Sequence, residues 1–189
     1  MIYFTSDFHF AHKKPFLFEP RGFSNVDDMN RTIIENYNSI IKDDDQVFIL
    51  GDCILNDDDE GIRCLTKLKG EKYLAFGNHD TNSRLEKYDF ANIFYGIDYG
   101  YRMKYDKFSF WCQHYPAKMG NYKDKHPTWC LSGHTHSKDK FQYGDDCIYN
   151  VAMDAHNCFP VSIEQIIKDI KEYRKTHPII PFEKESNDG

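Results

Sequence analysis

Five short polar clusters contain five of the nine histidines of this chain, together with carboxylate and amide side chains that could also bind a metal ion. They are Asp7-Phe8-His9, Gly51-Asp52, Gly77-Asn78-His79-Asp80, His114 and Gly133-His134-Thr135-His136. Imidazole and carboxylate groups together suit a borderline transition metal, and these clusters offer more donors than one ion can use. The pattern therefore predicts a pair of metal ions on loops at one edge of a sheet. Two-metal sites of this kind usually hydrolyse phosphate esters.

The first three clusters each follow a short apolar run that is typical of a strand. These runs are residues 2–6, 47–50 and 73–76. Residues 26–42 have apolar side chains at three- and four-residue spacing, which predicts a helix with one buried face. A second helix is expected over residues 61–68, with Gly70 placed to end it. Strands that alternate with helices are typical of a largely parallel sheet with crossover helices.

The second half of the chain has a different pattern, in which strands dominate. Residues 99–105 and 107–112 alternate around Asp106 and predict a β-hairpin. Further strands are expected at 128–132 and 147–151, and an amphipathic helix over 162–177 has Ser162 as its candidate cap.

These elements predict an α/β protein with four layers: two mixed β-sheets packed face to face as a sandwich, with helices outside. Every polar cluster then lies on the rim formed by the carboxyl ends of strands, which is the usual position of a ligand in layered α/β proteins. One domain is expected over residues 1–177, followed by a polar tail at 178–189.

The composition limits the classes of function and the compartment. The chain has 189 residues and a formal net charge of −6, which argues against binding of long nucleic acid through a basic surface. Its six cysteines are scattered without a Cys-x-x-Cys pair, a pattern that fits reduced thiols in the cytoplasm. No apolar run approaches the ~18 residues of a membrane helix, and a charge occurs too early for a signal peptide. A cytoplasmic protein with no membrane partner is therefore expected, and its oligomeric state stays open.

The five clusters have the order and spacing of the calcineurin-like metallophosphoesterase superfamily, which this chain resembles. The signature of that superfamily runs Asp-x-His, Gly-Asp, Gly-Asn-His-Asp/Glu, a single His and Gly-His-x-His. All five blocks occur here, between Asp7 and His136. The opening Thr5-Ser6-Asp7-Phe8-His9 further resembles the small single-domain phosphoesterases of bacteria and phages. Gly51-Asp52 is not followed by the Asp-Arg-Gly of protein Ser/Thr phosphatases, so a phosphoprotein phosphatase is not expected.

The resemblance implies a role for each donor residue. One metal ion would be bound by Asp7, His9 and His136, the other by Asn78, His114 and His134, and Asp52 would bridge both. A bridging carboxylate can hold two cations ~3.5–4 Å apart, so that a hydroxide shared between them attacks the phosphorus in line. Divalent or mixed-valence Mn, Fe, Zn or Ni all fit a set without thiolate ligands, and Mn is favoured.

His79 and Asp80 are the candidate catalytic residues besides the ligands. The resemblance leaves His79 unligated beside the substrate, where it could protonate the leaving oxygen or stabilise its charge. Asp80 could orient His79 or a metal ligand by accepting a hydrogen bond. The glycines at 51, 77 and 133 are expected to let the backbone turn sharply at strand ends.

Substrate recognition is expected from basic residues near the clusters. His12 and Lys13 could contact a substrate phosphate, or they could belong to a solvated loop. Arg21 could bind a phosphate through its guanidinium fork, or it could be an ordinary surface arginine. Lys123 lies in the long polar segment 115–127, which is a candidate flap over the bound substrate.

The leading hypothesis is a dinuclear metal-dependent phosphoesterase that acts on a small nucleotide-like phosphodiester. A phosphomonoesterase or a nuclease could use the same site. A non-catalytic metal-binding scaffold is the alternative from a different class, and it is disfavoured because every ligand position and His79 are present. The aromatic residues Phe16, Phe18 and Phe23 could belong to the core or could form a wall on which a base stacks.

Overall fold

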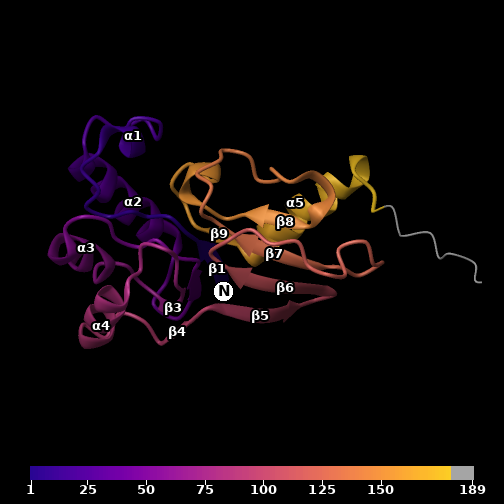
Figure 1. Ribbon diagram of the computed structural model, residues 1–189, viewed down its shortest axis with the longest axis horizontal. Helices are drawn as coiled ribbons and strands as arrows, with labels where there is room; N and C mark the ends of the chain where they lie inside the picture. Colours follow the sequence, from indigo (N-terminus) through magenta and orange to yellow (C-terminus); the bar gives the residue numbers. More distant parts are fainter. Residues whose placement is uncertain (180–189) are drawn as a thin grey trace, which may run out of the picture.

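The computed structural model describes residues 1–179 and has two β-sheets with helices packed against them (Figure 1). This arrangement confirms the predicted α/β fold class with two mixed sheets. Residues 180–189, which make up most of the predicted polar tail at 178–189, lie outside the described residues.

The first sheet has five strands in the order β4-β3-β2-β1-β9. These are β1 (Ile2–Thr5), β2 (Gln46–Ile49), β3 (Glu71–Ala75), β4 (Gly96–Asp98) and β9 (Val161–Ser162). Strands β1 to β4 are parallel, and β9 is antiparallel to β1. Because parallel neighbours cannot be joined by a tight hairpin, the chain returns between them through helices.

The helices between these strands cover one face of the first sheet. They are α2 (Val26–Ile40), α3 (Asp58–Leu65) and α4 (Asn82–Phe90), preceded by the short α1 (Pro15–Phe18). Helix α2 begins where the side chain of Asn25 accepts a hydrogen bond from the Asp28 backbone N–H at 2.8 Å. Its apolar stripe buries Met29 and Ile33 in one hydrophobic cluster with Ile49 of β2. Among the described residues, no helix is long and apolar enough to cross a lipid bilayer.

The second sheet has four strands in the order β5-β6-β7-β8. These are β5 (Gly100–Tyr105), β6 (Phe108–Gln113), β7 (Thr128–Ser132) and β8 (Ile148–Asn150). Strands β5 and β6 form the predicted antiparallel hairpin, and Asp106 in its turn has a positive φ of 52°. In contrast, β6, β7 and β8 are parallel to one another.

A second hydrophobic cluster fills the space between the two sheets. Phe4 and Phe48 of the first sheet lie in this cluster with Phe110 and Leu131 of the second. Helix α5 (Ile163–Thr176) contributes four buried isoleucines: Ile163, Ile166, Ile167 and Ile170. Ser162 caps α5 as predicted, because its hydroxyl accepts a hydrogen bond from the Gln165 backbone N–H at 3.1 Å.

Six parallel strands end at one rim of the sandwich, where the loops that follow them lie. Strands β1, β2 and β3 do so in the first sheet, and β6, β7 and β8 do so in the second. A parallel bridge between Ser6 and Ala152 joins the ends of β1 and β8, so the two sheets meet at this rim. The loops after these strands carry all five polar clusters.

Several element boundaries differ from those expected. Helix α3 begins at Asp58 rather than at residue 61, because the Asp57 carboxylate accepts a hydrogen bond from the Glu60 backbone N–H at 3.1 Å and caps it. The helix ends at Leu65, so Gly70 does not terminate it; with a φ of 82°, Gly70 instead makes the turn into β3. Elements α1, α4, β4 and β9 were not predicted, since all are short or only weakly amphipathic.

Candidate metal centre

Two groups of side chains at the rim have the geometry of metal ligands. The Asp7 group consists of Asp7, His9 and His136, and the His114 group consists of Asp52, His114 and His134. Within each group, the possible ligand atoms all lie within 4.8 Å of one another. These are six of the seven ligand positions that the sequence predicts, and Asn78 is the seventh.

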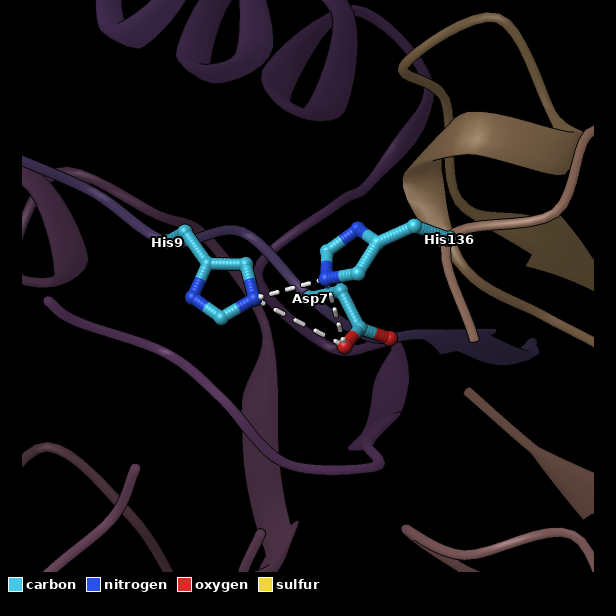
Figure 2. A group of neighbouring side chains, drawn as sticks. All are labelled: Asp7, His9 and His136. Carbon is cyan, nitrogen blue, oxygen red and sulfur yellow. Dashed lines mark hydrogen bonds and ion pairs between the residues drawn. The ribbon is translucent and has the colours of Figure 1, made fainter. Parts of the chain in front are cut away.

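The Asp7 group is formed by loops that follow β1 and β7 (Figure 2). The Nε2 atoms of His9 and His136 are 3.2 Å apart, and they lie 3.8 Å and 3.9 Å from Asp7 Oδ1. The second carboxylate oxygen of Asp7 accepts hydrogen bonds from the Ser6 hydroxyl at 2.6 Å and the His134 backbone N–H at 3.0 Å. Asp7 is therefore oriented by one oxygen and turns the other toward the two imidazoles.

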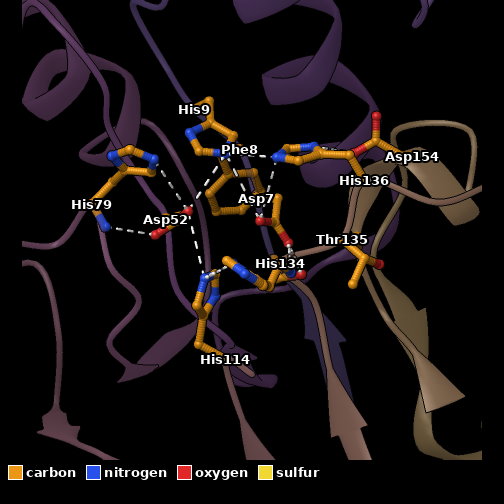
Figure 3. Close-up of polar contacts among 12 residues, drawn as sticks. Asp7, Phe8, His9, Asp52, His79, His114, His134, Thr135, His136 and Asp154 are labelled. Carbon is orange, nitrogen blue, oxygen red and sulfur yellow. Dashed lines mark hydrogen bonds and ion pairs between the residues drawn. The ribbon is translucent and has the colours of Figure 1, made fainter. Parts of the chain in front are cut away.

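The His114 group is formed by loops after β2, β6 and β7 (Figure 3), and Asn78, which lies beside it, comes from the loop after β3. His114 Nε2 lies 3.1 Å from His134 Nδ1, 3.0 Å from Asn78 Oδ1 and 3.5 Å from Asp52 Oδ2. The same Asp52 oxygen lies 3.6 Å from His9 Nε2 of the Asp7 group. Asp52 thus stands between the two groups, in the position that a bridging ligand requires.

The chemistry of the donor atoms fits bound cations. His114 Nδ1 lies 2.8 Å from the Leu50 carbonyl, which can only accept, so Nδ1 carries the proton and Nε2 presents a lone pair. That lone pair faces the oxygens of Asn78 and Asp52, and such a cluster of acceptors is repulsive unless a cation lies among them. Asp7 Oδ1 is likewise buried, and among the described residues it has no hydrogen-bond partner.

Burial also favours the neutral form that an imidazole ligand needs. The pKa of His9 lies well below its usual range, first because the ring is buried and next because a positive charge on His136 would repel its proton. A neutral His9 keeps a lone pair available for a metal ion. Burial raises the pKa of Asp52, an effect that the neighbouring His114 opposes and that a bound cation would also oppose.

The ligand loops have an unusual backbone conformation. Asp7, His9, Asp52, His134 and His136 all have positive φ values, of 58°, 48°, 58°, 72° and 52°. A left-handed residue costs roughly 1–2 kcal/mol unless it is glycine, and such strain is concentrated at functional sites. In Asp7-Phe8-His9 and in His134-Thr135-His136, the first and third residues are left-handed. The two donor side chains of each segment therefore both reach the two-metal centre (Figure 3).

Two of the three glycines in the clusters have a different function from the expected one. Gly51 has a positive φ of 90° and makes a sharp turn as predicted, but Gly77 and Gly133 do not have left-handed backbones. They are required for space instead. A Cβ on Gly77 would lie 2.3 Å from Asp52 Oδ1, and a Cβ on Gly133 would lie 2.1 Å from Asp7 Oδ2. These two glycines leave room for the ligand carboxylates.

His79 lies beside the centre, as the resemblance implies. Its ring stands edge-on to His9 with 5.4 Å between centroids, and its Nε2 is 4.0 Å from Asp52 Oδ2. The His79 side chain is 39% exposed, so it can meet a substrate. Its backbone N–H donates to Asp52 Oδ1 at 2.9 Å and thereby fixes the orientation of the bridging carboxylate (Figure 3).

Asp80 is buried and faces the main chain. Its carboxylate accepts hydrogen bonds from the backbone N–H groups of Asp52, Cys53 and Gly77 at 2.7, 3.1 and 2.9 Å. The Tyr88 hydroxyl donates a fourth at 3.0 Å. These contacts agree with the expected role of orienting a metal ligand, here through the backbone of Asp52. The alternative in which Asp80 orients the His79 ring has no supporting contact among the described residues.

Two of the four predicted substrate-binding residues are not placed to bind a substrate phosphate. The Arg21 side chain is only 1% exposed, and its guanidinium is engaged with Asp154 and with backbone carbonyls, so it is not available as a phosphate clamp. Lys123 lies near the beginning of β7. The side chain of Asn121, two residues before it, accepts a hydrogen bond from the backbone N–H of Thr128, the first residue of β7, at 3.0 Å. A five-residue strand, roughly 15 Å long, separates this end from the rim.

His12 lies next to the centre, and Lys13 follows it in the same loop. His12 is buried, its ring centroid is 6.2 Å from that of His9, and its Nδ1 lies 3.2 Å from Asn56 Nδ2. Lys13 is exposed and pairs with Asp57 at 3.8 Å. A phosphate contact by either residue stays a prediction.

Two further residues at the centre were not singled out from the sequence. Asp154 follows β8 and its Oδ2 lies 3.0 Å from His136 Nδ1, so it fixes the orientation of that ligand. The signal for it was the same as for the other clusters, a polar side chain at a strand exit. Tyr115 is 49% exposed and stands edge-on to His114 and His134, with centroids 4.9 Å and 4.8 Å away.

Comparisons with known proteins agree with a metal-binding α/β fold of this kind. The family model of calcineurin-like phosphoesterases matches residues 1–154. An uncharacterized protein of Methanocaldococcus jannaschii is 33% identical over 178 residues, covering 90% of this chain and 92% of the relative. The gene 66 protein of mycobacterium phage L5 is 35% identical over 82 residues, covering 41% and 39%. A crystal structure of a protein of unknown function from Aquifex aeolicus has the same fold, with a TM-score of 0.67 at 24% identity and coverage of 89% and 98%.

The chain belongs to the calcineurin-like phosphoesterase family. It is therefore a metal-dependent hydrolase of phosphate esters, with candidate ligand groups for divalent ions at the rim of its two sheets.

Proposed function

We propose that this phosphoesterase hydrolyses a small nucleotide-like phosphodiester in the cytoplasm, with two metal ions held by the Asp7 group and by the His114 group together with Asn78. Mn, Fe, Zn and Ni all suit donors that are only oxygen and imidazole nitrogen atoms, and Mn is the metal we favour among them. The six cysteines are buried and are scattered without a Cys-x-x-Cys pair, a pattern that supports a reducing compartment. No basic surface for long nucleic acid is expected at a net charge of −6.

Asp52 and His79 have defined tasks in this reaction. When bound, the two ions would acidify a water molecule and take up charge on the phosphoryl oxygens. Asp52 holds the two ligand groups in register, since its Oδ2 lies about equally far from His9 and His114. His79 donates a proton to the leaving oxygen, a task supported by its partial exposure and its place beside Asp52.

The observation that carries the choice of a diester is a pair of exposed aromatic rings on opposite ligand groups. Phe16 is 72% exposed and its ring is 5.3 Å from that of His12, which neighbours His9 of the Asp7 group. Tyr115 lies against His134 of the His114 group. A phosphodiester has two organic substituents, and a ring beside each ligand group can stack on a planar substituent. A phosphomonoester would use only one of them.

The test is a comparison of matched substrates on metal-reconstituted enzyme. Mn-loaded protein should turn over an aryl phosphodiester and a dinucleotide faster than the corresponding phosphomonoesters, and a chelator should abolish both activities. A preference for monoesters would refute the diester assignment. Lack of turnover with Mn, Fe, Zn and Ni would refute the proposed catalytic activity altogether and favour the scaffold alternative.

Substitution of the aromatic rings provides an independent test. Phe16→Ala and Tyr115→Ala should each raise KM for a dinucleotide by roughly 5- to 150-fold, since stacking on a base contributes about 1–3 kcal/mol. Neither change should affect a diester with two alkyl substituents, which cannot stack. Phe90→Ala is the matched control, because Phe90 is 94% exposed at the end of α4. Unchanged KM values in both variants would show that the rings do not contact substrate.

A further inference from the structure

Arg21 is a buried arginine that connects distant parts of the metal centre. Its Nε and Nη2 atoms donate to the two carboxylate oxygens of Asp154 at 3.0 Å and 2.7 Å, which forms a bidentate pair. Nη2 also donates to the Asp7 carbonyl at 2.8 Å, and Nη1 donates to the Phe8 carbonyl at 3.2 Å. One guanidinium thus holds the backbone of the Asp7-Phe8-His9 loop and a carboxylate 133 residues further along the chain.

Asp154 extends this connection to the third ligand of the Asp7 group. Its Oδ2, which Arg21 already holds, lies 3.0 Å from His136 Nδ1 (Figure 3). A proton on Nδ1 leaves the lone pair on Nε2, the atom that lies 3.2 Å from His9 Nε2. Every member of the Asp7 group is therefore tied to Arg21, through its own loop backbone or through Asp154.

The His114 group has separate supports. His114 is held by the Leu50 carbonyl, and the backbone of Asp52 is held by Asp80. The hydrogen bonds of Arg21 reach Asp7, Phe8, Met29 and Asp154, and within residues 1–179 none reaches His114, Asp52 or Asn78. The backbones of the two groups are joined, since the His9 N–H donates to the Asp52 carbonyl and the His134 N–H donates to Asp7 Oδ2, both at 3.0 Å. The side chains that orient His136 and His114 are nevertheless different, Asp154 with Arg21 for the first and the Leu50 carbonyl for the second.

We propose that Arg21 and Asp154 are positioning residues for the metal ion of the Asp7 group, and that the ion of the His114 group does not depend on them. The left-handed backbones at Asp7 and His9 need such a support, because this conformation persists only when the surroundings hold it. The fork of Arg21 satisfies two requirements together, since it fixes both the strained loop and the carboxylate that orients His136. This proposal rests on the metal dependence of the family and not on the diester substrate.

The test is a titration of metal-free protein with Mn²⁺, followed by calorimetry and by electron paramagnetic resonance. Arg21→Lys keeps the charge but cannot make the bidentate contact and both carbonyl bonds. Asp154→Asn keeps the shape but removes the charge next to His136. Both variants should bind one ion with unchanged affinity and the second about 10–100-fold more weakly, the usual effect of losing an outer partner of a ligand. At one equivalent of metal, the spectra of variants and wild type should agree; at two equivalents, the variants should lack the signal of a coupled Mn pair.

Arg63→Lys is the control substitution, because Arg63 pairs with Glu60 on the surface of α3, and it should bind two ions like the wild type. Thermal unfolding of the metal-free variants checks that they are folded before titration. Two ions bound with unchanged affinity in both variants would overturn the proposal. An equal loss of affinity for both ions would also overturn it, since the network would then support the whole centre. A failure of both variants to fold would assign the pair to folding rather than to metal positioning.

Discussion

Gly133 has no room for a side chain, and Gly133→Ala therefore tests whether the position of the Asp7 carboxylate controls metal binding. A Cβ at this position would lie 2.0 Å from Ser6 Oγ and 2.1 Å from Asp7 Oδ2. Real Cβ contacts are not shorter than 3.0 Å, so one side must move by about 1 Å. Ser6 and Asp7 are both fully buried, so the displacement cannot be taken up by movement into solvent.

The expected magnitude follows from the contacts that this displacement breaks. Asp7 Oδ2 would lose its hydrogen bonds to the Ser6 hydroxyl and the His134 backbone N–H, which orient the carboxylate. Loss of such partners usually weakens metal binding ~10–100-fold, and a 1 Å error at a reacting centre can cost ~10²-fold in rate. The added methyl group should also destabilise the fold by about 1–3 kcal/mol through overpacking.

The assay measures Mn²⁺ affinity, turnover of an aryl phosphodiester and urea unfolding for Gly133→Ala. Gly120→Ala is a matched control, because a Cβ on Gly120 has no atom within 4 Å, and it should leave all three quantities unchanged. If Gly133→Ala binds two ions as tightly as the wild type and turns over normally, the position of Asp7 does not control the centre and the reasoning is refuted.

Three more predictions concern the bridge, the proton donor and acid stability. Asp52→Asn should weaken both ions, because its carboxylate lies between the two ligand groups; retention of one ion at full affinity would contradict a bridging role. His79→Ala should retain both ions and lower kcat by ~10²–10⁴, with a larger loss for an alkoxide than for a nitrophenolate leaving group; an empty site would make His79 a ligand. Burial alone would raise the pKa of Asp169, but hydrogen bonds from Lys140 and Tyr149 lower it below 3.8. Its stabilising effect is then complete above pH 3.8 and is lost as the pH falls through the lower pKa of the folded state. Asp169→Asn should therefore cost about 1 kcal/mol in urea unfolding at pH 7 and less at pH 3, and an equal cost at both would oppose this explanation.

The convergence of the candidate ligands could be predicted from the sequence, because short buried strands are visible as apolar runs and the first three runs each end on a polar cluster. The sheets could be predicted less completely. Nothing in the residues showed that β6 and β7 are parallel, a pairing that makes segment 115–127 a crossover connection. That connection must return to the beginning of β7, which places Lys123 at the end of the sheet opposite to the rim.

Long-range pairing explains the misassigned role of Arg21. A guanidinium beside a ligand loop fits a phosphate clamp in the sequence, and only the fold shows that Asp154 occupies it. Asp154 follows a predicted strand and lies two residues before His156, but the sequence alone does not show that its carboxylate faces Arg21. Gly77 and Gly133 illustrate the same limit, since a sequence does not distinguish a glycine that makes a turn from one that leaves space for a carboxylate.

The strained ligand loops and the buried carboxylates that are not ligands belong to one arrangement. A left-handed ligand residue costs roughly 1–2 kcal/mol, whereas a hydrogen bond to a charged group contributes about 1.5–3 kcal/mol. Asp80 accepts backbone N–H groups from the Asp52 loop and the Gly77 loop, and Arg21 donates to the carbonyls of the Asp7 loop. An apolar side chain of similar size would fill the same space without offsetting the strain. The charges of Asp80, Arg21 and Asp154 are therefore needed where they are buried, because they hold the backbone in the conformation from which the ligands converge.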